Sequence, residues 1–447
     1  MVLRNLLVLF MLLGANLYGA TYSVSSAGQF ETAIGAVNVS SEDDTIMINA
    51  NIVLDALLPQ ISKAVGNLTI EGNGHTLNRN SSALEFRVLY IVTGTVNIDH
   101  LTISGGNSGP GHGGGIYVDS GMVILTNCTV SGNSVEYGGS YYGGGIYVDS
   151  GTVTLTNCAV LDNRADWGGG IYNSSGTLTL TSCTVSDNRA EYAGGICSSS
   201  GTLTLTNCTV SGNEALNGAG VYNSSTVTLT NCTVSNNAAT LEAGGIYNSG
   251  TLTLSNCTVS TNSAAQGAGI SNFGNMTLIR SMVSGNSGGS YGGAEIFQYG
   301  GNTTADSNNV FGHSGLTTAQ ALDGFVPGGT DVTCTSDGSN TALGSILNAS
   351  LADNGGPTQT HALVAGSPAI DIASTGPATD QRGISRPQGS GVDAGAYEFV
   401  PSDPDPIGEF NYRHNLVSNT AKLNAWVLDP DARLGVGANW TMEGDLS

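Results

Sequence analysis

A short block of residues recurs along this chain at a nearly constant spacing, and this repeat restricts the fold more than any other feature. Its clearest copy, GGGIYNSSGTLTLTSCTVSDN, runs from Gly168 to Asn188. Related blocks extend from about residue 113 to residue 286, and each ends on an asparagine. The first step between these asparagines is 30 residues and the later steps are 24 or 25, as their positions show: Asn133, Asn163, Asn188, Asn213, Asn237, Asn262 and Asn286. A constant period of this length is typical of a solenoid whose units stack on one another.

The apolar residues of the block alternate with threonine in every second position, as in TLTLT at residues 177–181. A period of two belongs to strands, whereas a helix needs 3.6. Three short strands fit each unit, on the GGGIY, TLTLT and CTVS segments, and Asn, Ser and Gly turns separate them. We therefore expect an all-β fold, a three-faced parallel β-helix with coils about 4.8 Å apart.

The alternation also predicts which side chains point inward. Four inward positions are expected in the second and third strands of a coil, and three coils fill them as Leu178, Leu180, Cys183 and Val185; Val96, Ile98, Leu101 and Ile103; and Met276, Leu278, Ser281 and Val283. Leucine, cysteine and serine thus share the third position. This position therefore selects small or apolar side chains rather than thiol chemistry.

Six of the eight cysteines occupy that third position: Cys128, Cys158, Cys183, Cys208, Cys232 and Cys257. Neighbouring coils would hold their Cβ atoms about 4.8 Å apart, which is beyond normal disulfide geometry. We expect a buried stack of free thiols rather than disulfides or a metal site. Cys197 and Cys334 lie outside the stack.

The N-terminus has the pattern of an export signal. Arg4 precedes an apolar run from Leu6 to Leu13, and small residues then lead to Gly19 and Ala20. This pattern predicts that residues 1–20 are a signal peptide and that the protein is secreted. No later segment approaches the roughly 20 apolar residues of a membrane-spanning helix, so we expect no transmembrane span in the mature chain.

The charge of the chain excludes some partners. With a net charge of −22 and only 12 lysines and arginines, nucleic acid is not expected as a partner. An acidic surface attracts divalent cations such as Ca²⁺ weakly. No cofactor is expected.

The GG(G/A)(I/V)YN element followed by LTLTNCTVSGN resembles the repeats of polymorphic outer membrane proteins and of related right-handed β-helix proteins in the pectin-lyase-like superfamily. The resemblance covers about residues 60–310 and implies a right-handed helix. The preceding residues 21–59 are similar to the opening of such proteins, where a short helix caps the first coil.

A second resemblance lies near the C-terminus. Residues 351–399, with LADNGGPTQTHALVAGSPAIDIA and TDQRGISRPQGSGVDAGAYEF, resemble the choice-of-anchor Q domain, which closes bacterial surface β-helices. This implies an irregular β module after a connecting segment at 311–350, and an extracellular or cell-surface location associated with the outer membrane. Residues 400–447 are an acidic, proline-containing spacer and tail of unknown role, without an anchor motif.

Two stripes of aromatic residues are the candidate binding surface. One follows the inward Ile of the GGGI strand, and the other lies four residues before it, with acids one place earlier. The candidate residues are Tyr117, Tyr147 and Tyr172 in the first stripe, and Tyr142, Trp167, Tyr192, Asp166 and Glu191 in the second. Exposed rings can stack on sugars while carboxylates accept hydrogen bonds from hydroxyl groups. The alternative is that the rings stack on each other and merely cover the coils.

No catalytic residue is predicted. Gly111-His112-Gly113 spells the GHG of polygalacturonases, but it lies at the glycine turn found in every coil, and the accompanying aspartate pair and basic element are absent. Asp162 and Asp187 occupy one place in adjacent coils and would fit a retaining glycosidase, although other coils have turn residues there.

The sequence thus predicts an adhesin-like or structural surface protein. Its expected partners are a surface or extracellular polysaccharide, or the surface of a host or neighbouring cell. The alternative is a polysaccharide-degrading lyase or glycosidase, and a mechanical spacer is a third option.

Overall fold

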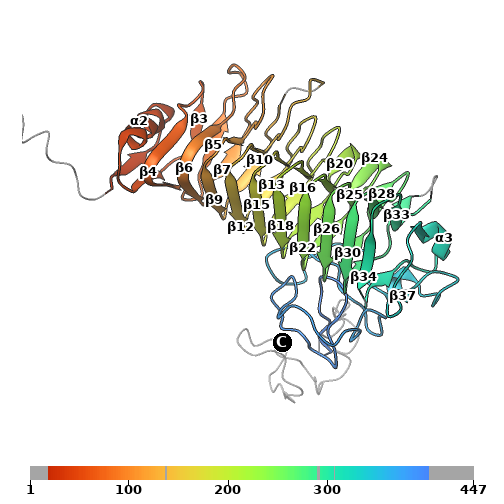
Figure 1. Ribbon diagram of the computed structural model, residues 1–447. Coiled ribbons are helices and arrows are strands. Elements are labelled where there is room, and N and C mark those ends of the chain that lie inside the picture. Colours follow the sequence, from red (N-terminus) through yellow and green to blue (C-terminus); the bar gives the residue numbers. More distant parts are fainter. Residues whose placement is uncertain (1–18, 136–137, 289–291, 307, 402–447) are drawn as a thin grey trace, which may run out of the picture. The chain divides into compact units, whose positions relative to one another are not determined.

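The computed structural model describes residues 19–135, 138–288, 292–306 and 308–401, and these residues form one compact unit (Figure 1). Most of the expected signal peptide and nearly all of the 400–447 tail lie outside the described residues. The architecture is a parallel β-helix, as the repeat predicts, and one sheet contributes a strand to each of twelve coils.

Each coil of the repeat contains the three expected strands. The first column consists of β8 (Ile116–Val118), β11 (Ile146–Val148), β14 (Ile171–Asn173), β17 (Ile196–Ser198), β21 (Val221–Asn223), β25 (Ile246–Asn248), β29 (Ile270–Asn272), β33 (Ile296–Gln298) and β36 (Leu322–Asp323). The second consists of β9 (Met122–Thr126), β12 (Thr152–Thr156), β15 (Thr177–Thr181), β18 (Thr202–Thr206), β22 (Thr226–Thr230), β26 (Thr251–Ser255), β30 (Asn275–Ile279) and β34 (Thr303–Asp306).

Upstream strands join these two columns into one 21-stranded sheet: β1 (Thr21–Val24), β2 (Asp44–Ile48), β4 (Ile61–Glu71) and β6 (Leu89–Asp99). β6 is long enough to pair with both β8 and β9, because it lacks the Ser-Gly turn that divides the later coils. Strands of the solenoid therefore already occur within residues 21–59.

The third column is a separate sheet of twelve strands: β3 (Ile52–Leu54), β5 (Thr76–Arg79), β7 (Thr102–Ser104), β10 (Thr129–Ser131), β13 (Ala159–Leu161), β16 (Thr184–Ser186), β19 (Thr209–Ser211), β23 (Thr233–Ser235), β27 (Thr258–Ser260), β31 (Met282–Val283), β35 (Val310–Phe311) and β37 (Val332–Thr333). A four-stranded sheet adds β20 (Glu214–Asn217), β24 (Ala238–Glu242), β28 (Ser263–Ala264) and β32 (Ser287–Gly288).

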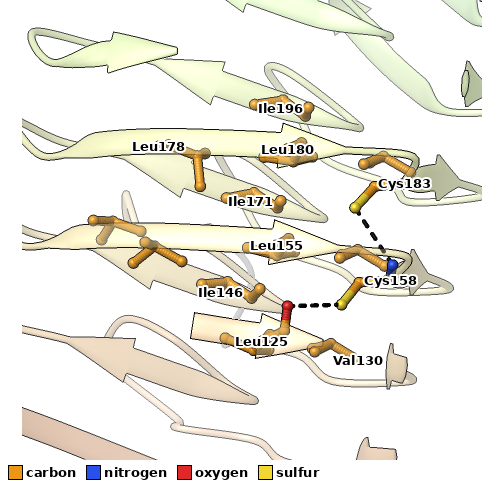
Figure 2. Close-up of a cluster of buried hydrophobic side chains, with 14 of the residues drawn as sticks. Leu125, Val130, Ile146, Leu155, Cys158, Ile171, Leu178, Leu180, Cys183 and Ile196 are labelled. Atoms are coloured by element: carbon orange, nitrogen blue, oxygen red, sulfur yellow. Dashed lines mark hydrogen bonds between the residues drawn. The ribbon is translucent and has the colours of Figure 1, made fainter. Parts of the chain in front are cut away.

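The predicted register and core are confirmed. Leu125, Leu155 and Leu180 are register partners on successive parallel strands and form a buried stack (Figure 2). The twelve predicted inward residues are all buried. All eight cysteines are free and buried, and in the stack the backbone N–H of Cys158 donates to Sγ of Cys183 at 3.4 Å.

The asparagine that closes each repeat has a structural role that the spacing alone did not predict. Asn213 is fully buried; its Nδ2 donates to Oδ1 of Asn237 at 2.9 Å, and its Oδ1 accepts from Nδ2 of Asn188 at 3.0 Å. The same bonds link the closing asparagines from Asn133 to Asn286 into one buried amide ladder. Each coil thereby satisfies the polar atoms of the next, as buried amides require.

Helix α2 (Ala27–Val39) closes the N-terminal end, as expected (Figure 1). Ser26 caps it by accepting from the N–H of Gln29, and its buried residues Phe30, Ile34 and Val37 join the apolar core of the coils. At the other end lie the short helix α3 (Thr318–Ala321) and the 3-10 helix η1 (Leu343–Ser345).

Residues 351–399, the C-terminal module, are irregular and pack on the outer face of the twelve-stranded sheet. Gln381 Nε2 donates to Thr209 Oγ1 at 2.8 Å, and Thr233 Oγ1 donates to Gln381 Oε1 at 2.7 Å. His361 Nε2 lies 2.7 Å from Ser235 Oγ. The outward side chains of Thr209 and Thr233 are fully buried, whereas Thr184, one coil upstream of Thr209, stays half-buried. The module therefore covers β19, β23 and β27.

Candidate functional site

The first aromatic stripe forms a continuous column on the outside of β8, β11 and β14. Tyr117, Tyr147 and Tyr172 are register partners. Their ring centroids are 4.9 Å apart for Tyr117 and Tyr147, and 5.6 Å apart for Tyr147 and Tyr172. These rings therefore stack on each other along the axis of the solenoid.

The second stripe packs against the first. Tyr142 stacks on Tyr172 at 4.6 Å, and His112 stacks on both Tyr142 and Tyr147 at 4.7 and 4.9 Å. Trp167 stacks on Tyr192 at 4.2 Å. The two expected stripes are thus one aromatic surface.

Cys197 interrupts the first column, and Trp167 contacts the part of the column beyond the interruption. Cys197 pairs in register with Tyr172 on one side and Tyr222 on the other. The edge of the Trp167 ring reaches Tyr222, with 5.5 Å between centroids, and Tyr222 then stacks on Tyr247 at 4.4 Å. We call this whole surface the aromatic ribbon; it consists of Tyr90, His112, Tyr117, Tyr142, Tyr147, Trp167, Tyr172, Tyr192, Tyr222 and Tyr247.

The ribbon presents ring edges and hydroxyl groups more than open ring faces, because mutual stacking uses much of the faces. Tyr147, expected to be exposed, is only 6% exposed, while Tyr117 and Tyr172 are half-buried. Burial raises the pKa of Tyr117 to about 12 and raises that of Tyr172 as well. The hydroxyls therefore stay protonated at neutral pH and can donate hydrogen bonds.

Asp166 was expected as a surface acid, and this expectation is wrong. Its exposure is 2%, and its carboxylate accepts from the backbone N–H groups of Gly138, Gly139 and Tyr141 at 2.7 to 3.0 Å. Burial alone would raise the pKa of Asp166, but these N–H groups outweigh it and lower the pKa below the usual value. Asp166 holds the loop that precedes Tyr142 and is not available to a ligand.

The other acid of the stripe, Glu191, is half-buried beside Tyr192. Arg189 of the same coil pairs with Glu214 of the next coil, at 3.6 Å, with both side chains more than 60% exposed. Such a pair contributes little to stability.

Asp162 and Asp187 lie at turns, as other coils suggest. Their φ angles are +56° and +58°, in the left-handed region that Gly132 also adopts in its coil. Asparagine and aspartate tolerate this region better than most residues. Both side chains are exposed.

The sequence reasoning missed Arg87, at the upstream end of the ribbon. Its guanidinium lies over the rings of Tyr117 and Tyr90, 4.6 and 5.1 Å from their centroids. Tyr90 is the register partner of Tyr117 on β6. Extending the tyrosine column one coil upstream, into the irregular part of the repeat, would have found both residues.

The described residues contain no group of three His, Cys, Asp or Glu side chains arranged to hold a metal ion. In the same part of the chain, no helix has the length and apolarity needed to cross a bilayer. A cavity of about 220 Å³ lies where Pro357 of the C-terminal module meets the coils around Cys158, but no charged side chain lines it.

The motif of the C-terminal module forms a buried polar network. Arg386 pairs with Glu398 at 3.2 Å, and both side chains are fully buried. Arg382 pairs with Asp380 at 2.8 Å, and its guanidinium lies 3.5 Å from the ring centroid of Tyr397. These motif residues therefore build the module and dock it on the coils.

Comparisons with known proteins identify the fold. Residues 87–250 match the family described as right-handed β-helix region. A crystal structure of pectate lyase Pel9A is similar, with a TM-score of 0.50 and 14% identity over 85% of this chain and 96% of the lyase chain. No curated protein matches the sequence. At this identity the likeness shows the fold, a right-handed parallel β-helix of the pectin-lyase type, and not the activity.

Proposed function

We propose that this chain is a secreted, surface-displayed β-helix protein of adhesin-like or structural type that binds an extracellular polysaccharide along the aromatic ribbon. The extension of the ribbon over successive coils carries the proposal, in two runs of ring contacts: Tyr90 to Tyr172, and Trp167 to Tyr247. Aromatic edges and protonated hydroxyls alternate over successive coils, from Tyr90 to Tyr247. An extended polymer suits such a one-dimensional surface, since each coil offers a similar contact to each repeat of the ligand.

The surface location rests on two sequence features, the N-terminal export pattern and the choice-of-anchor Q-like module. In the structure this module folds onto the coils through Gln381 and His361. We propose that it closes the solenoid on the side from which the chain continues toward an anchor at the cell surface, in association with the outer membrane.

The alternative, a polysaccharide-cleaving enzyme, has less support. A lyase or glycosidase needs an acid and a base that converge on one groove. Asp162 and Asp187 are exposed turn residues instead, and the described lysine, Lys63, is buried against Asp44 at 2.6 Å.

Affinity electrophoresis of the mature chain through gels that contain a panel of bacterial and plant polysaccharides tests the proposal. We expect at least one polysaccharide to retard the chain. The double variant Trp167→Ala/Tyr192→Ala should raise the dissociation constant for that polysaccharide about tenfold or more, which corresponds to a loss of about 1.4 kcal/mol of binding free energy. Val39→Ala is the control, because Val39 is an exposed apolar residue of α2 and makes no contact with the aromatic rings of the ribbon.

Retardation that survives the double variant would remove the ribbon from the binding surface. Release of new chain ends from any polysaccharide, lost in Asp162→Asn/Asp187→Asn, would instead establish the enzyme.

A further inference from the structure

The upstream end of the ribbon differs from the rest because it contains a positive charge without an acceptor. In the described part of the chain six other basic side chains hold a carboxylate, carbonyl or amide oxygen: Lys63, Arg79, Arg189, Arg280, Arg382 and Arg386. Arg87 contacts the rings of Tyr90 and Tyr117, and within the same described residues its N–H groups reach no hydrogen-bond acceptor. A half-buried guanidinium of this kind has its donors free for a ligand.

His112 adds a second free donor beside Arg87. Nδ1 of His112 accepts the backbone N–H of Tyr142 at 3.2 Å, so the neutral ring carries its hydrogen on Nε2. Burial, and then the charge of Arg87, lower the pKa of His112, which keeps the ring neutral. A Cβ atom on Gly111 would lie 3.3 Å from Nη2 of Arg87, which places the guanidinium against the backbone next to His112.

Carboxylates lie near the hydroxyl ends of the same tyrosines. Tyr147 Oη donates to Asp149 at 3.3 Å. After burial, the charges of Asp149 and Asp119 contribute to the raised pKa of Tyr117. In other coils serine occupies this place, at Ser174, Ser199 and Ser224. Three successive coils thus combine a cation, a neutral imidazole N–H, stacked rings and carboxylates.

We propose that Arg87, His112, Tyr117, Tyr147 and Asp149 form a subsite for a negatively charged sugar residue, whose anionic group binds the Arg87 guanidinium. Guanidinium binds carboxylate and sulfate groups with two parallel charge-assisted hydrogen bonds. The sugar hydroxyls donate to Asp149, and the exposed ring edges contact the apolar side of the sugar. This inference rests on the proposed function and deepens it, because it selects acidic polysaccharides over neutral ones.

The overall charge of the chain sharpens the inference. A net charge of −22 repels polyanions at long range. Retention of an acidic polymer that depends on one arginine is therefore due to direct contact rather than to a general positive field.

Three polymers with one backbone test the subsite: dextran, carboxymethyl dextran and dextran sulfate, in affinity electrophoresis of the full mature chain. We expect carboxymethyl dextran or dextran sulfate to be bound at least tenfold more tightly than dextran, and the stronger of the two identifies the anionic group. Arg87→Gln should abolish this preference, whereas Arg87→Lys should retain part of it. Arg189→Gln removes an exposed charge elsewhere and should change nothing.

Equal binding of all three polymers, or a preference that Arg87→Gln leaves intact, overturns the subsite. The proposed function is tested separately, by the panel of polysaccharides and the Trp167→Ala/Tyr192→Ala variant. Retention of none of the three also overturns it. Melting temperatures of both Arg87 variants distinguish a lost ligand contact from a loss of folding. Both variants remove the packing of the guanidinium on the tyrosine rings, so a difference in binding between them reflects the charge.

Discussion

The solenoid and the C-terminal module both bury polar side chains, but they satisfy them in opposite ways. In the solenoid one asparagine recurs in each coil from Asn133 to Asn286, and each inner amide of this ladder bonds to the amides above and below it. In the module four charged residues occur once each: Asp380, Arg382, Arg386 and Glu398. In the ladder an inner amide has two equivalent amide neighbours. In the module network each charged side chain has one oppositely charged partner, and no second copy of that pair exists in the network.

This difference teaches where the molecule is most sensitive to substitution. A buried ion pair that loses one partner leaves an uncompensated charge, and such losses are among the largest that single substitutions produce. A ladder that loses one amide leaves neutral groups unsatisfied, which costs less per group. We therefore expect the module network to be the more sensitive of the two.

The largest effect is expected for Arg386→Met. Arg386 donates to the carbonyl oxygens of Asp393 and Gly395 at 2.7 and 2.8 Å and pairs with Glu398. Its loss should reduce the free energy of unfolding by about 3 to 5 kcal/mol, measured by urea denaturation. Hydrogen exchange should also increase on β19, β23 and β27, which the module covers.

The control for this substitution is Arg189→Met, since the Arg189–Glu214 pair is exposed. We expect a change of at most about 0.5 kcal/mol. A loss below about 1 kcal/mol in Arg386→Met would contradict the greater sensitivity of the module network.

A smaller effect is expected in the solenoid for Asn213→Ala. The backbone N–H and Nδ2 of Asn188 both lose their acceptor, Oδ1 of Asn213. Two unsatisfied buried donors should cost about 2 to 4 kcal/mol in the same urea experiment. Thr179→Ala, on an outward position of β15, should cost much less. An Asn213→Ala protein as stable as Thr179→Ala would contradict the ladder's role.

The end of the amide ladder should make stability depend on pH. Asn286 donates to Glu295, a fully buried acid, and burial raises the pKa of Glu295 to about 7 although three N–H donors from Asn286 and Gly285 oppose the shift. Between the ordinary pKa of 4.5 and about 7, the folded state keeps a proton that the unfolded state has lost. Stability from this group is therefore complete below pH 4.5 and falls as pH rises to about 7, by up to about 3 kcal/mol.

Urea midpoints from pH 4.5 to 8 measure this contribution, and Glu295→Gln should flatten that part of the profile relative to the unmodified chain. His361 titrates in the opposite sense, because burial lowers its pKa and stability is then lost as the pH falls. The difference between the pH profiles of Glu295→Gln and the unmodified chain gives the contribution of Glu295 to stability. Parallel profiles would mean that Glu295 does not titrate in this range.

The coils could be predicted from the sequence because their information is local and repeated. Alternation placed Leu180 and Val185 inside, and the period placed Leu155 under Leu180. The aromatic stripes were found for the same reason. Their mutual stacking was one of the two alternatives that the sequence left open. The burial of Asp166 was not predicted, because it depends on a loop whose N–H groups converge on that carboxylate.

Arg87 and the docking of the module were missed for a different reason. Arg87 belongs to a coil whose sequence departs from the repeat, although its strand keeps the register with Tyr117. The contact between Gln381 and Thr209 joins residues far apart in the chain, and no periodicity relates them.

By itself, the sequence determined the solenoid, its register, its inward side chains and its stack of free thiols, since each follows from alternation within a coil and repetition between coils. Only the tertiary structure decided which outward residues stay available. The module buries Thr209 and Thr233, stacking consumes the tyrosine faces, and Arg87 keeps free donors. Availability depends on what else packs against a side chain, and distant segments of the chain supply those neighbours.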